Sequence, residues 1–241
     1  MLPLGWRLLM ETLSEVEVGP CRDSQYLRPL RVHYTQNGTR KHWDFMKTHD
    51  SVSILIFNST RESFILVKQF RPAVYMCECV RRGILPADIT TADCSPQSRM
   101  AAELLPASAG VTYELCAGIV DKPGLSLQEI AQEEILEECG YNVSVENLQK
   151  ITSYRSAVGV TGSKHTMFYV EVSDDLHVGA GGGQEKEGEL IEVVYIPLKD
   201  WQTFVFDECI PKTVGVNFAF MWFQSSIAPN LQASKCLPSS S

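Results

Sequence analysis

The sequence predicts an α/β fold, in which several β-strands are combined with few helices. Two strongly apolar segments, residues 51–58 and 63–70, follow one another across a polar turn and are typical of a central antiparallel pair. A capped amphipathic helix is expected at residues 126–140, and an apolar helix at residues 212–227 is expected to cover one face of the sheet. Antiparallel strands with so few helices favour a layered domain.

The 241 residues suffice for one large domain or a domain with a small appendage. We expect four parts along the chain. They are a flexible extension at residues 1–20, a β-hairpin region at residues 21–46, the main domain at residues 47–228 and a disordered tail at residues 229–241.

The hairpin is indicated by two alternating segments, residues 30–36 and 41–46. Asn37 and Gly38 lie between them, and Asn-Gly is the dipeptide typical of type I′ turns. An isolated hairpin is only marginally stable, so it needs another surface to cover it. We therefore expect this region to contribute to a homodimer.

The second central strand runs into the sequence KQFRPAVY, residues 68–75. Arg71 stands at its end, directly before Pro72, where a side chain can point into a cleft, although an arginine there is more often on the surface. Residues 81–110 are rich in Pro, Ser, Ala, Thr and Asp without a clear period, and we expect a mobile loop. Residues 111–115 are predicted to form the next strand.

The amphipathic helix has clear end signals. Ser126 and Glu129 form an S-x-x-E capping box, and Gly140 is expected to end the helix as a C′ glycine. At about 100° per residue, four apolar residues share one face: Leu127, Ile130, Ala131 and Ile135.

Three glutamates, Glu134, Glu137 and Glu138, are placed on the same side of this helix. They repel one another and lie in the last turn, where the helix dipole disfavours anions. Buried carboxylates need a partner, and residues 123–141 contain no Lys or Arg. Clustered carboxylate oxygens suit Mg²⁺, or Mn²⁺. Two interpretations remain open, a divalent-metal site or a solvated acidic face that docks a partner.

The chain beyond this helix completes the sheet. We expect strands at residues 148–156, 164–172 and 190–196, a glycine-bearing loop at residues 157–163, a flexible acidic loop at residues 174–189, and a short helical turn at residues 200–206.

Composition limits the partners. The net charge of −8 without basic blocks argues against nucleic acid or an anionic membrane. Eight scattered cysteines without C-x-x-C spacing indicate a reducing cytoplasm. The N-terminus lacks a cleavable signal pattern, and no apolar run approaches the length of a membrane span.

The segment from residue 118 to 141 resembles the Nudix box, G-x5-E-x7-R-E-U-x-E-E-x-G-U, in which U is aliphatic. Glu134, Ile135, Glu137, Glu138 and Gly140 match its second half, and Gly118 matches its first glycine if one extra residue is allowed.

This chain departs from the pattern at three positions. Glu133 stands where the family has Arg, Leu125 or Ser126 where it has its first Glu, and Tyr141 where it has an aliphatic residue. The family's Arg orients a metal-binding Glu, so another cation, such as Lys122 or Arg155, is expected to replace it.

The resemblance covers roughly residues 45–227 and implies a Nudix α/β/α sandwich with a mixed sheet. The sequences QFRP and ELCAG are similar to the ADP-ribose and UDP-sugar branch. There, the equivalent of Arg71 meets the pyrophosphate, and the equivalents of Ala117 and Glu114 help to hold metal. A glutamate of the mobile acidic loop acts as general base or extra ligand. Glu187 is the first candidate for that role, and Glu189 is the second.

The implied reaction is the metal-dependent hydrolysis of a nucleoside diphosphate sugar, with UDP-glucose giving UMP and glucose 1-phosphate. ADP-ribose is the alternative substrate. Trp43 is a candidate platform for stacking the base, supplied across a dimer, although a hairpin Trp is more often a packing residue. A Nudix domain that binds nucleotide without hydrolysing it is the alternative function, raised by Glu133.

Overall fold

The computed structural model describes residues 26–85, 105–184 and 188–235, together with the isolated positions 13, 16, 18, 21 and 24. Its strands are β1 Arg28–Gln36, β2 Thr39–Lys47, β3 Ser51–Asn58, β4 Ser63–Phe70, β5 Val111–Glu114, β6 Cys116–Ile119, β7 Gln149–Arg155, β8 Lys164–Val172 and β9 Ile191–Pro197. Its α-helices are α2 Pro72–Arg81, α3 Leu127–Glu134, α4 Trp201–Phe206, α5 Val214–Ser226 and α6 Ala228–Lys235.

The main sheet contains seven strands, in the order β5-β4-β3-β8-β7, with β6 paired to β3 and β9 paired to β4. Strands β3 and β8 run parallel, whereas β3 and β4 form the predicted antiparallel pair. Strand β3 is buried along nearly its whole length because neighbouring strands and both helical layers cover it. The sheet is therefore mixed, as the fold class requires.

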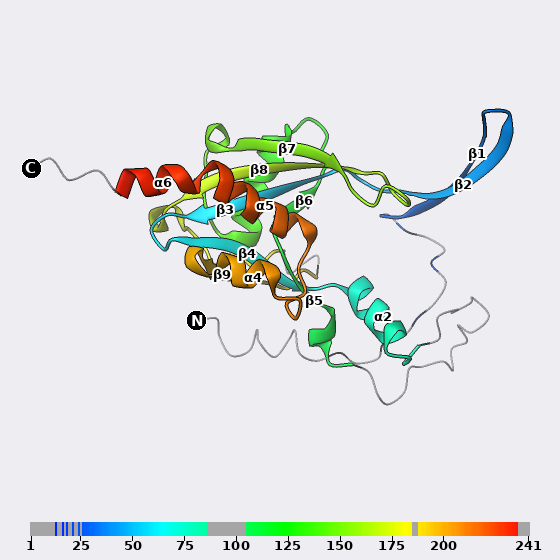
Figure 1. Ribbon diagram of the computed structural model, residues 1–241, viewed down its shortest axis with the longest axis horizontal. Coiled ribbons are helices and arrows are strands. Elements are labelled where there is room, and N and C mark those ends of the chain that lie inside the picture. Colours follow the sequence, from blue (N-terminus) through cyan, green and yellow to red (C-terminus); the bar gives the residue numbers. More distant parts are fainter. Residues whose placement is uncertain are drawn as a thin grey trace, which may run out of the picture.

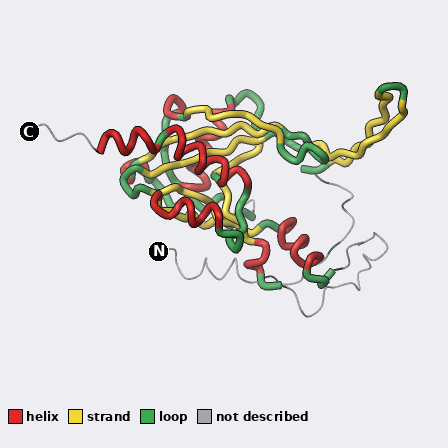
Figure 2. The backbone as a smooth tube through the Cα atoms, in the orientation of Figure 1, coloured by secondary structure: helices red, strands yellow, loops and turns green. Residues whose placement is uncertain are grey.

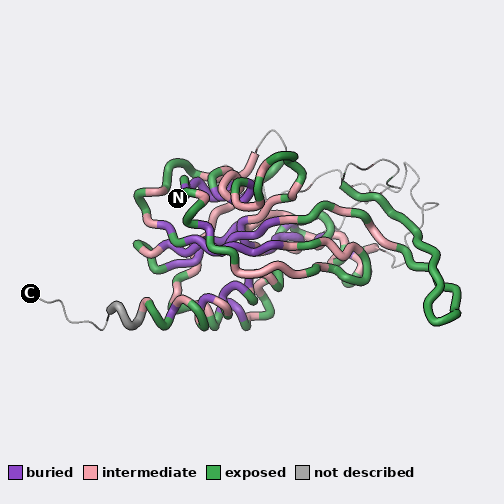
Figure 3. Tube along the Cα trace, turned by 90° about the horizontal axis from the view of Figure 1, so that it is seen from above, coloured by how far each residue is buried: buried purple, intermediate pink, exposed green. Residues whose placement is uncertain are grey.

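Helices cover both faces of this sheet (Figures 1 and 2). Successive residues of β3 point to opposite faces, so that Ile54 belongs to a core with Ile130 of α3, while Leu55 belongs to a second core with Phe220 of α5. Figure 3 shows the buried segments concentrated between these layers. The predicted α/β/α sandwich is confirmed.

The N-terminal hairpin of β1 and β2 forms a separate two-stranded sheet that projects from the body (Figure 1). Asn37 and Gly38 have φ values of 51° and 77°, which confirms the predicted type I′ turn. All nine residues of β1 are exposed, so no other described part of the chain covers this strand.

Two elements differ from the prediction. Helix α2 follows β4 directly, because Pro72 at its first turn suits a helix start; most of the predicted loop at residues 81–110 lies outside the described residues. Helix α6 replaces the disordered tail predicted from residue 229 as far as residue 235, and Leu231 packs against the second core. No helix in the described parts of the chain has the length and apolar character to span a membrane.

Candidate active site

The capping box at the start of α3 is formed as predicted. The Ser126 hydroxyl accepts the Glu129 backbone N–H at 3.2 Å, and the Glu129 carboxylate accepts the Ser126 N–H at 2.7 Å. Gly140 adopts the left-handed conformation with φ 75°. Because both signals are local, they fix where the helix begins and ends.

The end of the helix is not α-helical, which the sequence did not predict. Residues Ile135–Cys139 form a π-helical turn, a feature often found at functional sites. The backbone carbonyls of Glu137 and Glu138 accept N–H groups of Gly183 and Gly182, at 3.1 and 2.9 Å. The wider turn is therefore stabilised by contacts with a distant loop.

Glu138 is the most buried of the three predicted carboxylates, with 5% of its surface exposed. Its Oε2 accepts the Ala117 backbone N–H at 3.0 Å. Burial raises the pKa of Glu138 to about 8, in spite of this hydrogen bond. The site therefore contains a carboxyl group that an approaching cation would help to ionise.

Glu134 lies against Gly118 of β6. A Cβ atom at Gly118 would stand 2.0 Å from the Glu134 Oε1, so only glycine leaves room for this side chain. Burial, followed by the charge of Glu137, raises the pKa of Glu134 to about 7. The first glycine of the box thus acts by making space for a carboxylate.

The three carboxylates suit a hard divalent cation chemically, because two have raised pKa values and none belongs to a described ion pair. They do not yet converge. No group of three His, Cys, Asp or Glu side chains in the described residues is arranged to hold a metal. One Glu137 carboxylate oxygen accepts a hydrogen bond from the Gln184 side chain at 2.8 Å.

Arg71 and Glu114 are brought together. Arg71 follows β4, and its guanidinium makes two hydrogen bonds, at 2.8 and 2.7 Å, with the carboxylate of Glu114 at the end of β5. Glu114 raises the Arg71 pKa most strongly, and Glu138 and Glu189 also contribute. The positive charge of Arg71 therefore lies close to the carboxylates of the site, while its side chain remains 47% exposed.

The acidic loop is only partly described. Glu187, the first candidate base, lies outside the described residues. Glu189 is described, and its carboxylate accepts the Gln184 backbone N–H at 3.0 Å. Gln184 was not predicted as a site residue, although the glycine run before it indicates a close approach between backbones.

Comparison with known proteins adds to this geometry. The chain is 56% identical to the uridine diphosphate glucose pyrophosphatase NUDT14 of Bos taurus, over 92% of this chain and 99% of that protein. It is 52% identical to the protein of the same name from Mus musculus, over 92% and 99% of the two chains. The chain belongs to the Nudix hydrolase family. A GDP-mannose pyrophosphatase of Pectobacterium atrosepticum is 30% identical over 63% of this chain and 61% of its own length. No family model matches the chain.

At the position where the Nudix box has arginine, this chain has Glu133, an acidic residue that forms an ion pair with a lysine. Glu133 is bound by the Lys122 ammonium at 2.5 Å. Arg155 instead donates to the Gly162 carbonyl, at 3.1 Å. Of the two predicted substitutes, Lys122 is the one that pairs with Glu133, and the charges of Glu137 and Glu134 also raise its pKa.

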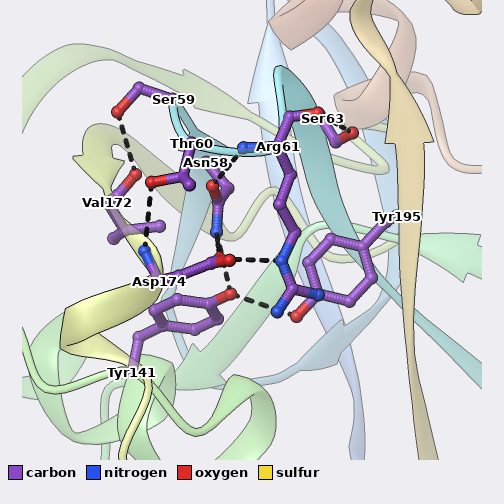
Figure 4. Close-up of polar contacts among 9 residues, drawn as sticks. All are labelled: Asn58, Ser59, Thr60, Arg61, Ser63, Tyr141, Val172, Asp174 and Tyr195. Carbon is purple, nitrogen blue, oxygen red and sulfur yellow. Dashed lines mark hydrogen bonds and ion pairs between the residues drawn. The ribbon is translucent and has the colours of Figure 1, made fainter. Parts of the chain in front are cut away.

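Tyr141, which replaces the last aliphatic residue of the box, is completely buried, and its hydroxyl takes part in a network of hydrogen bonds (Figure 4). The hydroxyl accepts a hydrogen bond from Asn58 at 3.1 Å and lies 3.0 Å from the Tyr195 hydroxyl. Asn58 and Arg61 both donate to Asp174, at 2.8 and 2.7 Å. This network anchors the chain just after Gly140 to the β3–β4 turn, which explains a polar group at that position.

Trp43 of the hairpin is 54% exposed and is not part of either core. Its indole N–H donates to the Gly159 carbonyl at 2.9 Å. The hairpin and the loop at residues 157–163 are thus joined through Trp43, and its ring remains accessible.

The raised carboxyl pKa values predict how the stability of the metal-free hydrolase depends on pH. The pKa of Glu138 rises from 4.5 to about 8 on folding, so the folded protein binds more protons than the unfolded chain between these values. The free energy of unfolding is expected to fall as pH rises through this window, by up to about 1.4 kcal/mol per pH unit for Glu138. Urea unfolding with EDTA, at several pH values, measures the slope.

The same series on Glu138→Gln serves as the control and should give a shallower slope. An unchanged slope in this variant, or stability that increases with pH, would contradict the assignment of a raised pKa to Glu138.

Proposed function

We propose that this Nudix hydrolase cleaves the diphosphate bridge of UDP-glucose and produces UMP and glucose 1-phosphate. The observation that carries the proposal is the high identity, over almost the full length, to relatives named uridine diphosphate glucose pyrophosphatase. Glu134, Glu137 and Glu138 support hydrolysis rather than nucleotide binding alone, since a binding module has no need of all three.

A divalent cation, Mg²⁺ or Mn²⁺, is proposed as the cofactor. Glu134, Glu137 and Glu138 would hold it, together with the backbone carbonyl oxygen of Ala117. When bound, such a cation neutralises the diphosphate and lowers the pKa of the attacking water. Glu114 is proposed to help hold the metal, and it also orients Arg71, because its carboxylate faces that guanidinium.

The protein's own groups would then act on the substrate. Arg71 neutralises diphosphate oxygens with its exposed edge. A glutamate of the acidic loop, Glu187 or Glu189, accepts the proton of the water as its oxygen attacks phosphorus. The P–O bond of the bridge breaks as the new P–O bond forms, and the bridging oxygen leaves with the departing phosphate.

A homodimer formed through the hairpin is proposed as the working state. Leu30, Val32 and Tyr34 alternate along β1 and are all exposed, and a two-stranded hairpin needs such cover. The dimer would place Trp43 where it can stack on the uracil. We also propose a cytoplasmic location, consistent with the six described cysteines, which are all free thiols.

The proposal is tested with a panel of UDP-glucose, ADP-ribose and GDP-mannose in the presence of Mg²⁺, with products identified by chromatography. UDP-glucose is expected to be cleaved fastest, giving UMP and glucose 1-phosphate. Faster cleavage of ADP-ribose would overturn the substrate assignment. Nucleotide binding without turnover of any compound would overturn the enzymatic one.

A further inference from the structure

The glycine loop, residues 178–184, lies against the end of the box helix. Its N–H groups at Val178 and Gly179 bond the Gly140 carbonyl at 2.9 and 3.2 Å, in addition to the bonds from Gly182 and Gly183 to the π-helical turn. Carbonyl groups that a helix end leaves without partners are thereby satisfied. Composition alone suggests a flexible linker here, but the backbone contacts show a segment that is docked on the helix.

The fit between loop and helix is so close that it excludes side chains. A Cβ atom at Gly140 would lie 1.9 Å from the Gly179 carbonyl oxygen, and one at Gly181 would lie 2.2 Å from the Glu138 carbonyl oxygen. Both glycines also have positive φ values. The backbone of the loop is therefore held against the end of the helix by close contacts between main-chain atoms.

Gln184 is the last residue of this docked segment, and it contacts one carboxylate of the box helix and one that lies further along the acidic loop. Its side-chain amide donates to Glu137 Oε2 at 2.8 Å, and its backbone N–H donates to Glu189 Oε2 at 3.0 Å. Glu137 belongs to the helix, whereas Glu189 is the last residue of the acidic loop, residues 174–189. One residue thus spans the two acidic elements of the site.

The chemistry of this position suits a neutral amide. A glutamate would place a third negative charge against Glu137 and Glu189, and a lysine would neutralise Glu137 and compete with a cation. An amide N–H fixes the direction of the carboxylate but leaves its charge. Hydrogen bonds to ligating carboxylates commonly tune metal affinity in this way.

We propose that Gln184 is a positioning residue, which aligns Glu137 for the divalent cation and ties the acidic loop to the box helix. The proposal rests on the proposed function for its effect on turnover. Its effect on cation binding does not depend on which substrate is used.

The test compares the full-length protein with Gln184→Ala and Gln184→Glu. Mn²⁺ binding is measured by calorimetry without substrate, and kcat and KM are measured with UDP-glucose. Loss of the amide is expected to weaken Mn²⁺ binding and lower kcat about tenfold, the lower end for such supporting contacts, with little change in KM. Gln184→Glu is expected to lower kcat further, through repulsion of Glu137.

Gln132→Ala is the matched control, because the Gln132 amide bonds a backbone carbonyl, that of Val143 at 2.7 Å, and no carboxylate. This variant should retain Mn²⁺ affinity. The proposal would be overturned if Gln132→Ala and Gln184→Ala lost Mn²⁺ affinity equally. It would also be overturned if Gln184→Ala bound Mn²⁺ within twofold of the parent's affinity. If the parent cleaves no nucleotide sugar, the proposed function fails, while the comparison of Mn²⁺ affinities still decides the role of Gln184.

Discussion

Replacing Glu138 by Gln is expected to lower kcat for UDP-glucose by about a hundredfold to a thousandfold, the range seen when one preorganised electrostatic contact is lost. The substitution keeps the size of the side chain and its ability to accept the Ala117 N–H, which is bonded at 3.0 Å. It removes the negative charge that we assign to the divalent cation. Steady-state kinetics at several Mg²⁺ concentrations measure the effect.

The stability of Glu138→Gln should not fall with its activity. A buried neutral amide avoids the cost of ionising the Glu138 carboxyl, whose pKa is raised to about 8 by burial. The metal-free variant is therefore expected to unfold at the same temperature as the parent, or a higher one, near pH 8. A large loss of activity together with undiminished stability distinguishes a catalytic role from a structural one.

Glu133→Gln is the matched control on the same helix. Glu133 is paired with Lys122, and both side chains are about two-fifths exposed, so the pair contributes little to stability. Its loss should change kcat by a few-fold at most. If Glu133→Gln and Glu138→Gln lowered kcat equally, the reaction would depend on the general acidity of the helix and not on the Glu138 position.

The parts of the site that could be predicted from sequence are those with local causes. Ser126, Glu129 and Gly140 determine the ends of the helix through contacts within a few residues. The hairpin turn at Asn37 and Gly38 has the same origin. The strongly apolar run of β3 likewise predicted a central strand, although its parallel pairing with β8 was not evident.

The parts that could not be predicted depend on distant segments. The π-helical turn is stabilised by hydrogen bonds from the glycine loop, which lies more than forty residues further along the chain. Regular helical spacing therefore placed Glu137 and Glu138 only approximately. Likewise, the pairing of Glu114 with Arg71 was not predicted, because it depends on how β4 and β5 align.

Adding one methyl group at Gly118 is expected to abolish most of the activity without unfolding the protein. The Cβ atom of Gly118→Ala would stand 2.0 Å from the Glu134 Oε1 and 2.5 Å from its Cγ, so the carboxylate must move away. Gly118 does not have a positive φ, and its backbone accepts alanine. Displacing a catalytic group by about 1 Å can cost a hundredfold in rate, and we expect a loss of this order in kcat, with weaker Mn²⁺ binding.

Gly159→Ala is the control, because a Cβ atom there meets nothing within 4 Å and the backbone is also free of positive φ. Thermal unfolding should give similar midpoints for both variants, since the atoms nearest to the new methyl group at Gly118 belong to the Glu134 side chain, which can turn aside. Unchanged kcat and Mn²⁺ affinity in Gly118→Ala would show that the reaction does not need Glu134 in its observed place. A loss of activity confined to Gly118→Ala would instead link the first glycine of the box to the position of one carboxylate, because the methyl group changes no charge and removes no hydrogen bond.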